Sequence, residues 1–405
     1  MDKKGKDNRL VGGILLVAGT SIGAGMLALP VSTSFGGFIP SIVIFFVCWL
    51  LMLVTAFFFL DVNLSIRGEP NLVSMAGKTL GIYGKILSWV FYLLLMYSLL
   101  AAYISGCSPL FQMTFTNVFH IILPKWFYHF ILPALFGGFV YLGTKGVDYL
   151  NRFLMFGLIV SYFLLVGYCP SFIESPRLLH QDYAASLLSI PIVITSFGYH
   201  IIIPTLTTYM NHDVKRLRKI LLIGSSIPFV IYIVWQWIIL GSVPLPQLVN
   251  AWQQGLPATA PLSKVAVSNW IAVGAKFFSF FAIVTSFLGV SLSLSDFLTD
   301  GLKIKKSWEG RLLAIFLTFI PPLIFIFTYQ KSFYIALEYA GVFVAILLGI
   351  LPSLMVLRLK NHPFYRRKRI KCLVFFVIFL SLGIIALNCL EKIGYLERFI
   401  TPYLI

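Results

Sequence analysis

Long apolar runs recur from one end of this 405-residue sequence to the other, and they constrain its fold more than any other feature. Each run has about eighteen or more residues with few charges, enough for a helix to cross a bilayer core of about 30 Å. Hydrophobic residues make up 59% of the chain and charged residues only 11%, a composition outside the range of soluble domains. The sequence therefore predicts an all-α polytopic membrane protein, because a spanning helix satisfies its own backbone polar groups.

The apolar runs predict eleven spans, which form a single integral membrane domain over residues 1–405. They cover residues 11–34, 38–63, 83–108, 128–146, 149–170, 186–210, 219–243, 268–299, 310–329, 333–357 and 372–390. Of the 31 Lys and Arg residues, 24 lie on the side of the N-terminus, 6 lie on the other side, and Lys276 lies inside a span. Since basic residues gather in cytoplasmic loops, the N-terminus is predicted inside and, after eleven crossings, the C-terminus outside.

Several classes of protein are disfavoured by the same sequence. The net charge of +17 is accounted for by the orientation signal, and no soluble segment is long enough for a nucleic-acid-binding module. The five cysteines are scattered without a CxxC pair, so neither a zinc site nor a disulfide framework is expected. A polytopic membrane enzyme is the remote alternative, but it would need a catalytic His cluster at one interface, and the six histidines are dispersed. We expect no enzymatic activity and no cofactor.

The first span contains residues that normally interrupt helices. Residues 11–30 read VGGILLVAGTSIGAGMLALP, with glycines at Gly19, Gly23 and Gly25 and a proline at Pro30. Glycine and proline are costly inside a helix. Unwound backbone at membrane depth is tolerated only beside a cavity or a ligand. Freed amides and helix N-termini suit a carboxylate, and freed carbonyls suit an ammonium group or a cation.

The sixth span is interrupted in the same way. Residues 186–210 read SLLSIPIVITSFGYHIIIPTLTTYM, with Gly198 and Pro204 near the middle. Two interrupted spans at matching positions, crossing in opposite directions, predict a 5+5 inverted repeat with a solute site at the bilayer midplane. The repeats would cover about 11–170 and 186–357, followed by an extra helix at 372–390. The alternative is that these glycines and prolines are ordinary packing notches and kinks.

Four stretches together resemble the hydroxy/aromatic amino acid permeases, the bacterial tyrosine- and tryptophan-specific transport proteins of the amino acid/polyamine/organocation superfamily. They are AGTSIGAGMLALP in the first span, LAAYISG in the third, TSFGYHIIIP in the sixth and TSFLGVSLSLSDFL in the eighth. The resemblance implies the fold of the bacterial leucine transporter, with discontinuous helices 1 and 6 and one added helix. It also implies proton-coupled uptake of tyrosine or tryptophan across the bacterial inner membrane, which makes the outer terminus periplasmic.

The resemblance further implies two sets of site residues. The substrate would be held by Gly19, Thr20, Ser21, Gly23, Ala24 and Gly25 in the first span and by Ser196, Phe197, Gly198 and Tyr199 in the sixth, with Phe197 and Tyr199 near its side chain. A coupling cation, as in sodium-coupled relatives of this fold, would be held by the hydroxyls of Thr285 and Ser286 and the carbonyls of Gly19, Ile22 and Ala282. These oxygen donors suit Na⁺. Proton and sodium coupling therefore both stay open, as do the choice between tyrosine and tryptophan and the oligomeric state.

Ionisable residues inside spans are expensive and are therefore functional candidates. Glu338 lies about five residues into the tenth span, where it would carry a proton or pair with a nearby lysine. His200 lies in the interruption of the sixth span and would titrate during transport or form a structural hydrogen bond. Asp61 lies near the inner end of the second span, as a proton-linked group or a solvated boundary residue. For Thr285 and Ser286, the alternative role is a hydrogen bond to the carbonyl one turn back.

Overall fold

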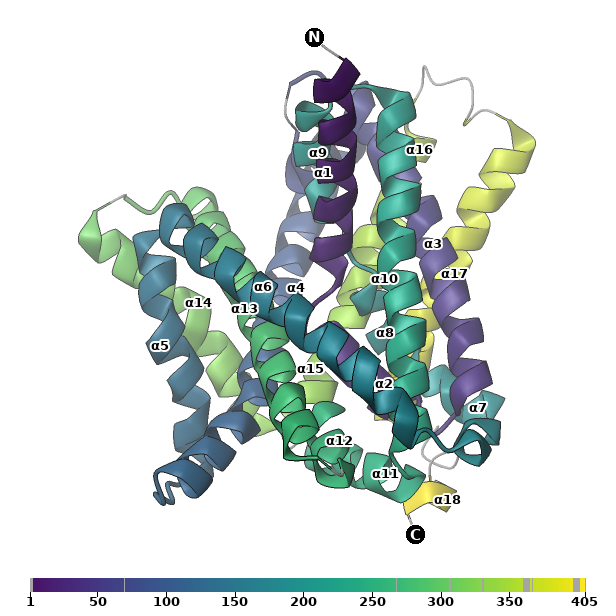
Figure 1. Ribbon diagram of the computed structural model, residues 1–405. Coiled ribbons are helices and arrows are strands. Elements are labelled where there is room, and N and C mark those ends of the chain that lie inside the picture. The colour runs from purple at the N-terminus through teal and green to yellow at the C-terminus, as the bar shows by residue number, and fades with distance from the viewer. Residues whose placement is uncertain are drawn as a thin grey trace.

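The computed structural model describes residues 3–68, 70–266, 268–305, 307–329, 331–359, 365, 367–395 and 401–404. Helices make up the regular structure of these residues, and none of them lies in a strand (Figure 1). The N-terminus and α18 (Thr401–Leu404) lie at opposite ends of the bundle, as an odd number of crossings requires (Figure 1). Four of the basic residues counted for the orientation lie outside the described residues: Lys306, Lys360, Arg366 and Arg398.

The helices follow the predicted order in both halves of the chain. The first half contains α1 (Lys3–Ser21), α2 (Gly25–Thr33), α3 (Phe38–Ser65), α4 (Leu72–Val118), α5 (Tyr128–Leu142) and α6 (Thr144–Tyr168). The second half contains α7 (Tyr183–Ser186), α8 (Ile190–Ser196), α9 (Ile203–Tyr209), α10 (Val214–Ser242), α11 (Leu245–Gln254), α12 (Thr259–Val265), α13 (Asn269–Gly301), α14 (Trp308–Thr328), α15 (Ser332–Val344), α16 (Leu351–Leu357) and α17 (Lys368–Lys392). A π-helical turn at Ala345–Ile350 joins α15 to α16.

The predicted fold class, an all-α polytopic membrane protein, is confirmed. Among the described residues, nine helices are long and apolar enough to cross a membrane, and the bent pair of α1 and α2 raises the count to ten. The span predicted at 128–146 corresponds to α5, whose 15 residues fall short of a full crossing at 1.5 Å per residue. In Figure 1, α5 connects the end of α4 to the start of α6, and the eleventh crossing stays a prediction.

Both interruptions predicted from glycine and proline are breaks in the structure. The first break separates α1 from α2 at residues 22–24, and the axis turns by 53° between the two helices. The second break separates α8 from α9 at residues 197–202 and includes a 3₁₀ turn at His200–Ile202. The third span is longer than the predicted 83–108, because α4 covers Leu72–Val118. A positive φ of 76° at Gly81, which glycine adopts without strain, interrupts the helix near its start.

Polar side chains join α10 to α3 and to the first broken helix. Trp49 Nε1 in α3 donates to Ser225 Oγ in α10 at 3.1 Å. Further along α10, Gln236 Nε2 donates to Thr33 Oγ1, at the end of α2, at 2.6 Å. The bond of Gln236 is buried and the bond of Trp49 is partly buried, and in such places a missing partner is costly. Together they fix α10 against α3 and against the end of α2.

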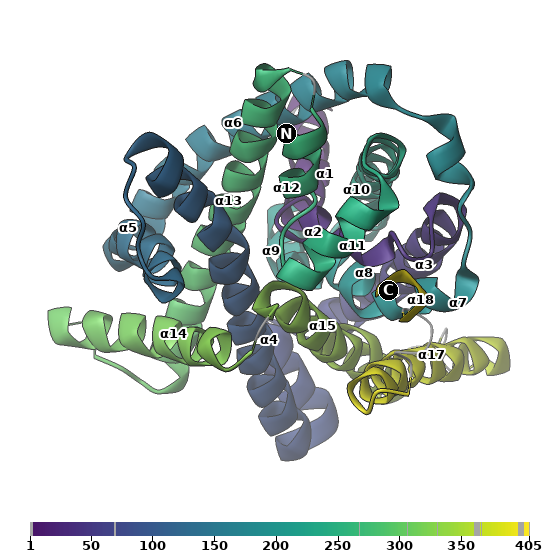
Figure 2. The same ribbon diagram turned by 90° about the horizontal axis from the view of Figure 1, so that it is seen from below.

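Two short helices cover the end of the bundle opposite the N-terminus. They are α11 and α12, which follow α10 and lie across the foreground of Figure 2. The amide of Ala258, just before α12, donates to Leu27 O in α2 at 2.9 Å. The hydroxyl of Tyr334 in α15 donates to Leu256 O at 2.6 Å. The segment between α10 and α13 therefore closes this end over the first break.

Candidate substrate site

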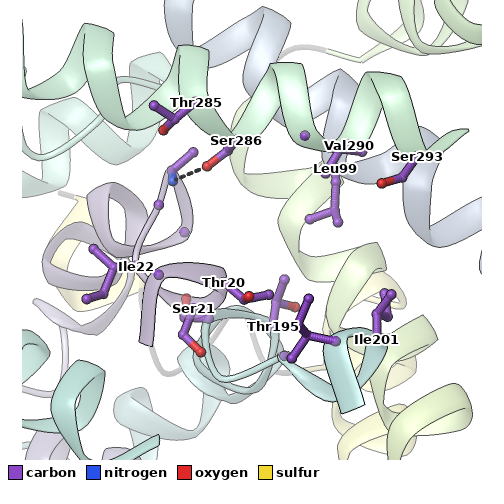
Figure 3. Close-up of a pocket in the computed structure, with 18 of the residues that line it drawn as sticks. Thr20, Ser21, Ile22, Leu99, Thr195, Ile201, Thr285, Ser286, Val290 and Ser293 are labelled. Carbon is purple, nitrogen blue, oxygen red and sulfur yellow. Dashed lines mark hydrogen bonds between the residues drawn. The ribbon is translucent and has the colours of Figure 1, made fainter. Parts of the chain in front are cut away.

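A cavity of about 540 Å³ lies between the two breaks and helices α4, α6 and α13. Figure 3 shows the first break beside α13, with the second break on the other side of the open space. The cavity is lined by Leu15, Leu16, Gly19, Thr20, Ser21, Ile22, Gly23, Ala24, Gly25, Tyr92, Met96, Leu99, Tyr103, Asn151, Met155, Thr195, Ser196, Gly198, Ile201, Ile202, Thr285, Ser286, Gly289, Val290, Ser293 and Leu337. Backbone of the breaks forms one wall, and the larger side chains of α4 with the smaller ones of α13 form the other.

The first break needs glycine because two neighbours approach it closely. A Cβ on Gly23 would lie 2.3 Å from Ser286 Oγ in α13, and one on Gly25 would lie 2.8 Å from Ser196 Oγ in α8. The Ala24 amide, which belongs to the same turn, donates to Ser286 Oγ at 3.1 Å (Figure 3). The two breaks and α13 therefore meet at contacts that a side chain on either glycine would prevent.

Most of the residues predicted for the substrate site line this cavity. All six residues predicted in the first span do so, and Ser196 and Gly198 do so from the sixth. Phe197 and Tyr199 do not, and both are fully buried. The Phe197 ring packs against Tyr232, with centroids 5.2 Å apart, and Tyr199 packs against His200 at 5.2 Å. The expectation that these two aromatic rings face the substrate side chain does not hold in this conformation, because both rings fill the protein core.

The residues predicted to hold a cation are only partly brought together. Gly19, Ile22, Thr285 and Ser286 line the cavity, whereas Ala282 does not. Thr285 Oγ1 donates to Phe281 O at 2.8 Å, and Ser286 Oγ donates to Ala282 O at 2.9 Å. This is the hydrogen bond to the preceding turn that the sequence leaves open as the alternative. The Ala282 carbonyl therefore accepts hydroxyl protons in this conformation, although each hydroxyl oxygen retains lone pairs that a cation would use.

The sequence reasoning missed the wall opposite the first break. Tyr92 and Tyr103 of α4, Asn151 of α6 and Ser293 of α13 bring polar groups to the cavity. The Asn151 amide oxygen and the Ser21 hydroxyl are buried without a hydrogen-bond partner in the part of the chain that the structure describes. Two unsatisfied polar groups in one cavity are suited to a ligand that donates hydrogen bonds. Two of these residues lie in stretches that the sequence analysis had already singled out. Tyr103 lies in LAAYISG, and Ser293 lies in the motif of the eighth span.

Two of the three ionisable candidates form ion pairs. Glu338 Oε2 lies 2.5 Å from Lys392 Nζ in α17, and the carboxylate is buried. Asp61 Oδ1 lies 3.0 Å from Arg218 in α10, and its Oδ2 accepts a hydrogen bond from the Tyr365 hydroxyl at 2.6 Å. Neither carboxylate is among the residues that line the cavity. Each instead joins two segments: Glu338 joins α15 to the last span, and Asp61 joins α3 to α10.

His200 lies in the second break but faces away from the cavity. Its Nε2 lies 2.9 Å from Thr55 Oγ1 in α3, and the side chain is fully buried. Its ring packs edge-on against Phe59, with centroids 6.0 Å apart. Its Nδ1 has no partner among the described residues. The structural hydrogen bond that the sequence leaves open is therefore present, and a titrating role stays a prediction.

The first break also matches a pattern known from hydrolases. Residues Gly19 to Gly23 read G-T-S-I-G, which fits G-x-S-x-G. In those enzymes the serine sits on a sharp turn between a strand and a helix. Ser21 instead ends α1, and its backbone carbonyl accepts a hydrogen bond from Tyr232 in α10. The structural context that would give this serine a nucleophilic role is therefore absent here.

The cavity is open toward the end of the molecule that holds the N-terminus. Leu15 and Leu16 of α1 line that part of the cavity and are 62% and 43% exposed. Helices α11 and α12 cover the opposite end (Figure 2). An aromatic cluster lies there, in which Phe35 contacts Trp252 at 5.4 Å and Tyr403 of α18 at 5.9 Å. The structure is therefore open on one side of the site and closed on the other.

Asp182 ties the C-terminal segment to this closed end. Its carboxylate accepts hydrogen bonds from the amides of Ala184 and Ala185 and from the hydroxyl of Tyr403. Burial acts to raise the pKa of Asp182, but these hydrogen bonds outweigh it and hold the pKa below the usual value of 3.8. The same contact and burial raise the pKa of Tyr403 to about 12.

The depressed pKa of Asp182 predicts a loss of stability in acid. Because the folded state binds this proton less well than the unfolded state, the stabilisation is complete above the unfolded pKa and is lost as the pH falls through the folded pKa. We expect the thermal midpoint of the purified protein to fall as the pH drops below about 4, the ordinary pKa of an aspartate, and Asp182→Asn to flatten that slope. Equal slopes for the original protein and Asp182→Asn would contradict the assignment.

Two broken helices that meet at a cavity within a bundle of membrane-spanning helices define the class of secondary transporters. A family model, the tryptophan/tyrosine permease family, matches residues 6–391, and the chain belongs to this family. It is therefore a multi-pass membrane permease rather than an enzyme.

Individual relatives agree with this family. The chain is 34% identical to tyrosine-specific transport system 1 of Haemophilus influenzae, over 86% of this chain and 88% of that protein. It is 31% identical to the tryptophan-specific transport protein of the same organism, over 86% and 87%. It is 28% identical to glutamine transporter 2 of Aliivibrio fischeri, over 87% and 90%. Among solved structures, a manganese transporter of Eremococcus coleocola shares the fold, with a TM-score of 0.63 at 15% identity over 99% of this chain and 94% of that one.

Proposed function

We propose that the protein imports an aromatic amino acid, tyrosine or tryptophan, across the bacterial inner membrane by cation symport. The observation that carries this proposal is the cavity between the two breaks, whose volume lies within the range of small-molecule sites. Gly25 at the start of α2 lines the cavity, and the partial positive charge at this end of the helix suits a carboxylate. Tyr92, Met96 and Leu99 of α4 offer an apolar wall to an aromatic ring. The names of the relatives, tyrosine- and tryptophan-specific transport proteins, support the same substrates.

The orientation that goes with this function places the N-terminus in the cytoplasm and the C-terminus in the periplasm. The excess of basic residues on the side of the N-terminus supports it. In that orientation, the cavity opens to the cytoplasm past Leu15 and Leu16. The conformation is then the one from which a substrate leaves into the cell.

Proton coupling is the first candidate for the driving force, and sodium coupling is the second. Proton coupling is favoured because the hydroxyls of Thr285 and Ser286 both donate to the Ala282 carbonyl, which is therefore already engaged. Sodium coupling is favoured by the position of Gly19, Ile22, Thr285 and Ser286 along one side of the same cavity. A sodium ion would have to share the Ala282 carbonyl with these two hydrogen bonds, whereas a proton would not.

Uptake into proteoliposomes tests the function directly. We expect labelled tyrosine or tryptophan to accumulate under an imposed proton gradient, and an uncoupler to abolish the accumulation. Replacing Na⁺ at a fixed proton gradient should leave uptake unchanged. If uptake is lost when Na⁺ is replaced, transport is coupled to sodium. Glutamine belongs in the competition panel, because one relative is named a glutamine transporter. If neither aromatic amino acid is taken up under either gradient, the proposal is wrong.

A further inference from the structure

One hydroxyl contacts both broken helices. Tyr232 lies in α10, and its side chain is fully buried. Its hydroxyl lies 2.6 Å from the carbonyl oxygen of Ser21, the last residue of α1. The same hydroxyl lies 2.9 Å from the carbonyl oxygen of Ser196, the last residue of α8. Both distances are those of good O–H···O hydrogen bonds.

The two carbonyls have an electrostatic reason to need a donor. The last carbonyls of a helix have no partner within that helix, and the C-terminal end of a helix carries partial negative charge. Here α1 and α8 bring two such ends to one point. Without a positive group between them they would repel each other, and both oxygens would be buried without a donor. Carbonyls at an unwound helix end can also bind a cation. Here the hydroxyl proton of Tyr232 provides the positive charge that a cation would otherwise provide.

The rest of the Tyr232 side chain is held as firmly as its hydroxyl. Its ring packs against Phe197 of the second break, with centroids 5.2 Å apart. On the same helix, Ser225 accepts a hydrogen bond from Trp49, and Gln236 donates to Thr33. The contacts on either side of Tyr232 therefore fix α10 against α3 and α2. The hydroxyl therefore has a fixed position relative to the ends of α1 and α8.

We propose that Tyr232 is a positioning residue, which holds the C-terminal ends of α1 and α8 together through its hydroxyl, without an ion at this junction. Because the predicted substrate residues lie on both breaks, the distance between Ser21 and Ser196 sets the width of the site. A single proton serves two acceptors, so the hydroxyl can shift its bond from one carbonyl to the other. The junction thus stays closed while either helix end moves slightly.

The test compares Tyr232→Phe with Tyr162→Phe. Tyr162 is a matched control, because its hydroxyl in α6 donates to Ile231 O of the same helix α10 at 3.3 Å, and Tyr162 is not among the residues that line the cavity. Nitroxide labels at Val11 in α1 and Leu187 just before α8, both exposed, report the relative position of the two broken helices. The exposed Cys372 and Cys389 are replaced by serine in this background. We expect a shifted or broader distance distribution for Tyr232→Phe and an unchanged one for Tyr162→Phe.

Uptake gives a second readout, which rests on the proposed function, whereas the distance measurement does not. We expect Tyr232→Phe to raise the KM for the transported amino acid about tenfold, since a lost buried hydrogen bond misaligns the site, and Tyr162→Phe to stay within about twofold of the original protein. Superimposable distance distributions for all proteins would overturn the proposal. A lower maximal rate at unchanged KM, proportional to the amount of folded protein, would also overturn it by showing a merely structural role.

Discussion

Replacing Gly23 by alanine is expected to lower uptake about a hundredfold, because the added Cβ would lie 2.3 Å from Ser286 Oγ. A separation that short requires Ser286 to turn away or α13 to move from the first break. Either movement would break the hydrogen bond from the Ala24 amide to Ser286 Oγ. The substrate and the coupling ion are both predicted to bind at this break, so binding and coupling should fail together.

A second substitution should relieve the clash. Ser286→Ala removes the hydroxyl oxygen and leaves the Ser286 Cβ 3.6 Å from the added Cβ, which is an ordinary contact. Ser286→Ala alone leaves the Ala24 amide without that acceptor and should lower uptake about tenfold. The double variant should transport no worse than Ser286→Ala, so the two losses should be strongly non-additive.

Initial rates of uptake per amount of reconstituted protein check this double-mutant cycle. Gly167→Ala in α6 is the matched control, because its Cβ would have no neighbour within 4 Å and Gly167 lies outside the cavity lining. It should transport like the original protein. If the double variant combines the two losses in full, the contact between Gly23 and Ser286 does not cause the defect.

The broken helices were predictable because their signal is local. Gly23, Gly25 and Pro30 lie within eight residues of one membrane span, and this local pattern predicts an interruption. Gly198 and Pro204 predict one in the sixth span. The count of basic residues predicts an orientation without any knowledge of packing, and that orientation stays a prediction. The length of α5 was not predictable from such a local pattern, because hydropathy marks an apolar stretch and says little about where a helix begins.

The wall of the cavity formed by α4 and α6 was not predictable in the same way. Asn151 and Tyr92 lie in spans whose apolar residues surround the whole helix, so periodicity does not show which face turns inward. Phe197 was misplaced for a related reason: a position in the break predicts that the backbone is unwound, but the direction of the ring depends on Tyr232, 35 residues further along the chain. The partners of Glu338 and Asp61 were likewise fixed only by tertiary packing.

Replacing Lys392 by methionine is expected to destabilise the protein by about 3 kcal/mol, because it leaves the Glu338 carboxylate buried without its cation. The effect is placed at the lower end of the range for buried pairs, since the Lys392 side chain is 34% exposed and partly screened by solvent. Glu338→Gln should cost less, because Lys392 can extend toward water once its partner is neutral. Combining Glu338→Gln with Lys392→Met should restore most of the stability lost in Lys392→Met. Thermal or chemical unfolding of the four purified proteins measures these differences.

The same variants separate an ion pair from a proton carrier. If Glu338 serves mainly to bind α17 to α15, then Glu338→Gln should still accumulate substrate under a proton gradient, in proportion to the amount of folded protein. If Glu338 carried the coupling proton, the glutamine variant would keep exchange of internal for external substrate but lose accumulation, because an amide cannot release a proton. We expect accumulation to persist, since Lys392 occupies the carboxylate at 2.5 Å and Glu338 lies outside the cavity lining. Exchange without accumulation would refute the structural role and identify Glu338 as the group that couples transport to the proton gradient.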